Sequence, residues 1–258
     1  CMFCTDDKHP SDLLEKGHID YIAREAINKY GVDPIIAVKA ACHHASRYFL
    51  LNNRGAIAPG YLADFAVIDN FKDFNVEMVF KKGVLYWNNG ELRDFDAPQI
   101  EEYLDKRAHD TFHVATLTPD DFRDTRQRGV LGMVPGEIIT TDNGYADHVD
   151  LEKDILKIAV VERHKGTHHI GLGYIQGYGL KSGAVATSIS HDSHNIIVVG
   201  TNSADMAFAA NYIVEHHGGI VAVENGVVKG SVVLEIAGIM SDRPLTEVND
   251  QLEAAKAA

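Results

Sequence analysis

The sequence predicts a mixed fold that combines α/β and α+β parts, because its hydrophobic pattern changes twice along the chain. Residues 1–54 carry apolar side chains at helical spacing, whereas residues 55–97 carry short apolar runs separated by turn residues. From residue 129 onward, strand-like and helix-like segments alternate. We therefore expect four segments: residues 1–54, residues 55–97, a connector at 98–128 and a C-terminal α+β domain at 129–258.

Two helices are expected in the first segment. An amphipathic helix is predicted over residues 11–30, and Gly31 suits the left-handed position that ends many helices. Asp33 is predicted to cap a second helix, because its carboxylate can accept the first amide hydrogens and Pro34 suits the first turn. The apolar positions of this second helix continue to Leu51.

The next two segments differ in character. The short apolar runs between residues 55 and 97 predict a small β-sheet, with a turn at residues 88–90. Its strands are expected at residues 65–68, 76–80 and 84–87. The connector at 98–128 is charged and compatible with helix, with a helix start at residues 118–121.

The last segment predicts an α+β domain in which strands and helices alternate. Asn225 and Gly226 form the strongest hairpin signal, since both residues tolerate the left-handed backbone of a tight turn. A helix is expected to start at Ser203 or Asp205, and another follows residue 242. Strands are expected at residues 155–161, 195–199, 220–223 and 227–233, and a glycine-rich segment begins at residues 170–173.

Composition excludes some classes of partner. The formal charge of −13 argues against nucleic acid, because binding a phosphate backbone needs clustered Lys and Arg. No run approaches the ~18 apolar residues that cross a bilayer, and no basic segment followed by an apolar one marks a signal peptide. The cysteines Cys1, Cys4 and Cys42 have no zinc-finger spacing and make no even disulfide set. We expect a cytoplasmic protein with reduced thiols and no membrane partner.

Asp6 and Asp7 are the first candidate site residues. They follow a short apolar run that ends at Cys4, which we expect to be a strand, and they precede a helix. Two interpretations are open for this pair. One carboxylate caps the following turn, or a carboxylate at the end of a strand binds a divalent metal and moves protons. A carboxylate ligand suits Mn²⁺, Fe²⁺ or Zn²⁺.

A second candidate site precedes the strand expected at 195–199. His191, Asp192 and His194 suit substrate hydrogen bonding, proton transfer or a further metal. The alternative is a polar loop whose side chains satisfy the local backbone. Asn195 leads directly into the apolar strand, so its carboxamide is expected to serve the turn. Asp64 is interpreted as structural, because it leads into a buried strand.

Several strings of residues resemble known families. Residues 55–69, GAIAPGYLADFAVID, resemble the segment with which amidohydrolase-superfamily enzymes pass from a (β/α)8 barrel into a small flanking β-sandwich. Together with residues 3–10, 171–183 and 191–200, the chain is similar to the adenine deaminase family of that superfamily. The resemblance implies the end of a barrel at 1–54, a β-sandwich segment at 55–97 and the characteristic C-terminal domain of the family at 129–258.

The resemblance also implies an activity. The family hydrolyses adenine to hypoxanthine and ammonia with a divalent metal, Mn²⁺ or Fe²⁺ and alternatively Zn²⁺, and its members are expected to be homodimers. Asp6 is implied as the metal-contacting aspartate and general base at the end of the last barrel strand, with Asp7 its weaker rival. His191, Asp192 and His194 would be auxiliary or substrate-binding residues.

Part of the family's metal site has no counterpart here. The family builds its metal centre from a His-x-His pair and further ligands, and this chain contains no His-x-His. We therefore expect these 258 residues to be the C-terminal portion of the enzyme and inactive by themselves. Two other functions remain open: a structural or oligomerisation module of an amidohydrolase, and an amidohydrolase that acts on another cyclic amide.

Overall fold

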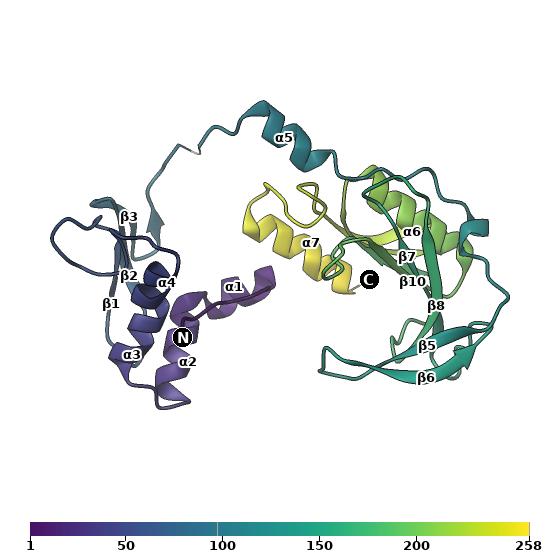
Figure 1. The fold of residues 1–258 in the computed structure, drawn as a ribbon, viewed down its shortest axis with the longest axis horizontal. Coiled ribbons are helices and arrows are strands. Elements are labelled where there is room, and N and C mark those ends of the chain that lie inside the picture. Colours follow the sequence, from purple (N-terminus) through teal and green to yellow (C-terminus); the bar gives the residue numbers. More distant parts are fainter. Residues whose placement is uncertain (97, 258) are drawn as a thin grey trace. The chain divides into compact units, whose positions relative to one another are not determined.

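The computed structural model describes residues 1–96 and 98–257, and the chain forms two compact units, Cys1–Gln99 and Ile100–Ala258 (Figure 1). Each unit is described by itself. No helix within the described residues is long and apolar enough to cross a membrane.

Unit 1 begins with two short helices where one was expected. Helix α1 covers Pro10–Lys16 and α2 covers Ile19–Asn28, so the prediction of a single helix over 11–30 is wrong. The chain breaks at Gly17, whose φ of 97° lies outside the helical region. Asp20 stabilises the break, because its carboxylate accepts the His18 N–H at 2.8 Å.

The second expected helix is present as one continuous helical segment. It consists of α3 (Pro34–Val38), a π-helical turn η1 (Lys39–His43) and α4 (His44–Tyr48). The predicted cap is confirmed, since Asp33 Oδ1 accepts the N–H groups of Ile35 and Ile36 at 2.9 and 3.1 Å. The segment ends before Leu51, because Leu50 adopts a left-handed φ of 57°.

A four-stranded antiparallel sheet completes unit 1. Strands β1 (Phe65–Ile68), β2 (Val76–Lys81), β3 (Val84–Asn88) and β4 (Glu91–Leu92) lie in chain order, which confirms the three expected strands and adds a short fourth. The rings of Phe65 and Phe80 stack across β1 and β2 with centroids 4.7 Å apart. Such cross-strand aromatic pairs stabilise the ladder beyond its backbone hydrogen bonds.

The strand expected before Asp6 is not present. Residues 1–6 have no β-ladder partner among the described residues, and the Phe3 N–H instead donates to the Ala40 carbonyl at 3.1 Å. An extended segment becomes a strand only when its backbone groups pair with a neighbouring strand. In the described part of unit 1, the backbone partner of Phe3 is therefore Ala40, which lies in a helical segment rather than in a strand.

Unit 2 is built on an eight-stranded sheet in the order β12-β11-β9-β10-β7-β8-β5-β6, with β5 and β8 its one parallel pair. The strands are β5 (Arg128–Met133), β6 (Thr140–Ala146), β7 (Ile155–Val161), β8 (Ile170–Gln176), β9 (Ala184–Thr187), β10 (Ile196–Gly200), β11 (Gly219–Glu224) and β12 (Val227–Val233). Asn225 and Gly226 adopt φ values of 53° and 71°, which confirms the predicted hairpin turn.

Two helices cover parts of this sheet. Helix α6 (Ser203–Glu215) packs on β9, β10 and β11, and α7 (Leu245–Ala257) packs on β12 (Figure 1). Helix α6 starts at Ser203, one of the two expected starts, and Asn202 caps it, because its Oδ1 accepts the Asp205 N–H at 2.8 Å. The main core lies between α6 and the sheet and includes Met206, Ile213, Ile196 and Val221.

The segment expected as a connector takes part in this core. It contains α5 (Glu102–His109) and a 3-10 turn, η2 (Pro119–Phe122). Leu117 and Phe122 are buried in the main core, and the Asn211 side chain bonds both the N–H and the carbonyl of Leu117. The second half of residues 98–128 is therefore packed into the core of unit 2 and is not a free connector between segments.

Candidate functional site

Asp6 and Asp7 are exposed on unit 1. The Asp7 N–H donates to Asp6 Oδ1 at 3.0 Å, and Asp6 has a left-handed φ of 51°. Neither residue caps the following helix, because α1 starts at Pro10 and His9 occupies its N-cap position. Asp6 thus presents a carboxylate at the surface of unit 1, where a ligand can reach it.

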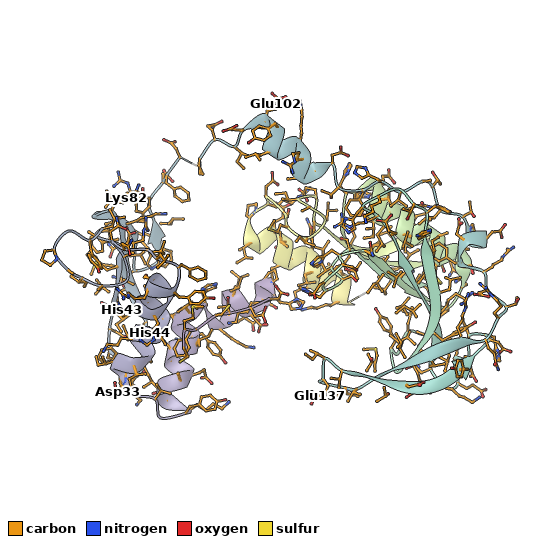
Figure 2. The ribbon with its side chains drawn as sticks, in the orientation of Figure 1. Asp33, His43, His44, Lys82, Glu102 and Glu137 are labelled. Atoms are coloured by element: carbon orange, nitrogen blue, oxygen red, sulfur yellow. The ribbon has the colours of Figure 1, made fainter. Side chains whose placement is uncertain are left out.

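The described residues do not by themselves complete a metal site. No group of three or more His, Cys, Asp or Glu side chains that could hold a metal ion occurs in residues 1–96 and 98–257. His43 and His44 lie next to each other on the helical segment of unit 1 (Figure 2), and His44 Nδ1 bonds the Cys1 carbonyl at 2.8 Å. Divalent metals are usually held by three or more protein ligands, so this donor set does not fit a complete centre.

Asp64 has the structural role expected for it. Its Oδ2 accepts Arg54 Nη1 at 2.5 Å, and its Oδ1 accepts the Lys82 N–H at 2.7 Å. These bonds tie the segment before β1 to the turn between β2 and β3. Both carboxylate oxygens of Asp64 are therefore used within the fold.

The second candidate site is a loop of unit 2 at residues 190–195, called here the 190–195 loop. It enters β10, and β10 pairs antiparallel with β7 so that Ile196 lies opposite Val161. Residues that precede Ile196 therefore lie beside residues that follow Val161. This register brings the 190–195 loop next to residues 162–164.

Within the loop, His191 and His194 lie close together. Their ring centroids are 5.0 Å apart in an edge-to-face arrangement. The Asp192 side chain is fully exposed, and its Oδ1 lies 4.0 Å from His191 Nδ1. The structure thus brings all three predicted residues together on one loop, where His191 and Asp192 are exposed and His194 is partly exposed, while Asp6 and Asp7 belong to the other unit.

The backbone geometry orients the His194 ring. His194 has a left-handed φ of 50°, and its N–H donates to the Ser190 carbonyl at 2.6 Å. In return, the Ser190 N–H points at His194 Nδ1 at 3.4 Å. A backbone N–H can only donate, so Nδ1 accepts and the proton of the neutral ring lies on Nε2.

Residues 162–164, which follow β7, support the loop. His164 Nε2 donates to the Ser193 carbonyl at 2.8 Å, and Arg163 Nε donates to the His194 carbonyl at 2.5 Å. The Arg163 N–H also reaches Asn195 Oδ1 at 3.4 Å, in line with the turn role expected for Asn195. Sequence reasoning missed Arg163, because one arginine after an apolar strand carries no local signal of burial.

Glu162 organises the turn that follows β7. Its carboxylate accepts N–H groups from His164 and Lys165 at 2.6 and 2.9 Å, and the Thr167 hydroxyl at 2.9 Å. Desolvation raises the pKa of Glu162, but these hydrogen bonds outweigh it and bring the pKa from 4.5 to about 2. Glu162 therefore stays ionised and fixes the turn that carries His164.

Chemically, the loop offers hydrogen-bonding side chains of both kinds, donor and acceptor. His194 carries an Nε2–H donor and Asp192 an exposed acceptor, and the two imidazole rings contact each other edge to face.

Each of the two units matches a known protein family. Residues 1–86 match the amidohydrolase family, and residues 136–258 match the adenine deaminase C-terminal domain. The chain is 41% identical to an adenine deaminase of Kosmotoga olearia, over 97% of this chain and 44% of that protein. It is also 40% identical to an adenine deaminase of Nitratidesulfovibrio vulgaris, over 97% and 44%, and 41% identical to one of Petrotoga mobilis, over 98% and 45%. The chain thus spans less than half the length of these relatives.

Proposed function

Because this chain is homologous to adenine deaminases along almost its whole length, we propose that it forms part of an enzyme that hydrolyses adenine to hypoxanthine and ammonia. The observation that carries this proposal is the order of the two family matches. The amidohydrolase match lies within unit 1 and the adenine deaminase C-terminal match within unit 2, in one continuous chain.

In this proposal Asp6 is the aspartate that contacts a divalent metal and moves protons during hydrolysis, and Asp7 plays at most a supporting part. The exposed carboxylate of Asp6 is compatible with that role. The remaining metal ligands would come from outside the described residues, because these contain no cluster of donors. Mn²⁺ and Fe²⁺ are the preferred ions, with Zn²⁺ as an alternative.

We assign the 190–195 loop to substrate binding. Adenine carries acceptor ring nitrogens and an amino donor, which complement the His194 Nε2–H and the Asp192 carboxylate. Residues 191–193 of the loop are exposed and His194 is partly exposed, so a ligand can reach them without opening the core of unit 2.

A chimeric enzyme tests this proposal. The chain would replace its matching portion in the Kosmotoga olearia relative, and hypoxanthine and ammonia formation from adenine would be measured with Mn²⁺ or Fe²⁺. We expect turnover by the chimera and none by these 258 residues alone with the same ions. A chimera that folds and takes up metal but leaves adenine unchanged, beside an active parent, would contradict the proposal.

The same chimera separates the alternatives. Turnover of a cyclic amide in preference to adenine would identify another amidohydrolase activity. Unchanged adenine kinetics after both His191→Ala and His194→Ala would reduce the 190–195 loop to a structural element.

A further inference from the structure

A buried arginine lies directly beneath the 190–195 loop. Arg163 is only 2% exposed, although a guanidinium is among the groups that lose most by leaving water. Burial lowers the pKa of Arg163, although the group stays protonated at neutral pH because an arginine pKa starts above 12. A buried charge of this kind persists only where its donors are well satisfied.

The guanidinium joins three separate segments of unit 2. Nε donates to the His194 carbonyl at 2.5 Å, Nη1 to the carbonyl and hydroxyl of Thr111 at 2.9 and 3.1 Å, and Nη2 to the Ala237 carbonyl at 2.9 Å. Its Cζ also lies 4.2 Å from the centre of the Phe112 ring. All of these acceptors are neutral oxygens, and the aromatic face adds a cation–π contact.

This geometry requires an arginine. The planar guanidinium presents donors in three directions, so one side chain can hold three segments at fixed angles. A lysine ammonium is a point charge on a flexible stem and can satisfy fewer of these distant acceptors at once. The backbone of Arg163 adds two more contacts, because its carbonyl accepts the His113 N–H at 2.8 Å and its N–H reaches Asn195 Oδ1.

From these contacts we infer that Arg163 is a positioning residue, which holds the His194 carbonyl so that the imidazole presents its Nε2–H to the substrate. The inference rests on the proposed substrate role of the 190–195 loop. Arg163 touches no ligand in this role. It acts through the left-handed backbone of His194 and the Ser190–His194 hydrogen bonds.

The test uses the 258-residue chain with Arg163→Met and Arg163→Lys, and Asn211→Ala as matched control. Asn211→Ala removes two hydrogen bonds from the core of unit 2 but none from the loop. Amide hydrogen exchange at His194 and the ¹⁵N shifts of its ring report loop order and tautomer. The Val198 amide of β10 reports the fold of the sheet.

In Arg163→Met we expect His194 exchange to accelerate about ten- to a hundredfold, since a hydrogen bond from a charged donor is lost, with Val198 protected. The ring shifts should move toward an average of two tautomers, and Arg163→Lys should fall between wild type and Arg163→Met. An unchanged His194 amide and tautomer in Arg163→Met would overturn the inference. Equal changes in Asn211→Ala would overturn it as well, because the effect would then be global.

This readout is separate from the test of the proposed function, since no adenine is present. In the chimera, Arg163→Met should lower kcat/KM for adenine mainly through KM, and Arg163→Lys should restore part of it. If the loop loosens while His194→Ala leaves adenine kinetics unchanged, the substrate role is wrong and the positioning of His194 still holds.

Discussion

The Asp205 carboxylate accepts the Gly226 N–H at 2.8 Å and so joins the first turn of α6 to the hairpin turn between β11 and β12. The same carboxylate accepts the Asn225 backbone N–H at 3.2 Å and the side-chain Nδ2–H of Asn202 at 2.8 Å. Asp205 is buried, and desolvation opposes its charge, yet these bonds lower its pKa below the usual value.

Asp205→Ala should destabilise the chain by about 2 kcal/mol, because the buried carboxylate loses its charge-assisted hydrogen bonds from the Asn225 and Gly226 N–H groups. Urea unfolding of unit 2 measures the loss. Asp250→Ala, on the exposed side of α7, is the control and should change stability by less than about 0.5 kcal/mol. Equal stability of the two variants would show that Asp205 does not hold the turn.

Phe122→Ala should cost about 3–5 kcal/mol, since Phe122 is fully buried in the main core and its removal leaves a cavity. Thermal or urea unfolding checks this value. Tyr103→Ala is the matched control from the same 98–128 segment, because Tyr103 is exposed on α5. If Phe122→Ala were as harmless as Tyr103→Ala, Phe122 would not anchor the 98–128 segment in the core, and that segment would be a connector as the sequence predicts.

The pH dependence of stability should reflect Glu162. Its pKa is about 2 in the folded chain against 4.5 unfolded, so the unfolded state binds the proton first as the pH falls. The stabilisation from Glu162 is therefore complete above about pH 4.5 and is lost between there and about pH 2.

Glu162→Gln should flatten this part of the stability curve, measured as thermal midpoints between pH 5 and pH 2.5. Glu152→Gln is the control, because Glu152 is exposed and lies outside the turn after β7. A Glu162→Gln curve parallel to wild type through that range would refute the assignment.

Asp6 and Asp7 should differ sharply in the chimeric enzyme. Asp6→Asn should lower kcat for adenine about 10²- to 10⁴-fold, the usual loss on removing a group that transfers protons. Asp7→Asn should keep kcat within about tenfold of the parent chimera. Metal content is measured in both variants. Equal losses of kcat in Asp6→Asn and Asp7→Asn would contradict the assignment of the catalytic role to Asp6 rather than Asp7.

His194→Ala in the chimera should lower kcat/KM for adenine about tenfold or more, because one hydrogen bond to the substrate is lost. His148→Ala is the control, since His148 is an exposed histidine of unit 2 that pairs with Asp147. Similar kinetics for both variants would argue against substrate binding by the 190–195 loop.

Sequence reasoning succeeded where neighbouring residues decide the backbone. The Asp33 cap, the Asn225–Gly226 turn and the ends of β1 and β7 depend on contacts over a few residues, and all are present in the structure. It failed at Gly17, where the structure breaks the predicted helix into two. The apolar residues keep their helical spacing across this break, so the pattern does not reveal that Asp20 accepts the His18 N–H and stabilises it.

In the candidate site too, some features followed from the sequence and others only from the tertiary structure. The sequence alone established three features of the candidate site. These are the residue types of the 190–195 loop, the order of the strings that resemble known families, and the absence of a His-x-His pair. Tertiary structure alone decided that Leu117 and Phe122 join the core and that Arg163 lies buried beneath His194. The acceptors of Arg163 lie 31, 52 and 74 residues away along the chain. Local patterns carry no information on such partners, because only the pairing of β7 with β10 and the closure of the core bring them together.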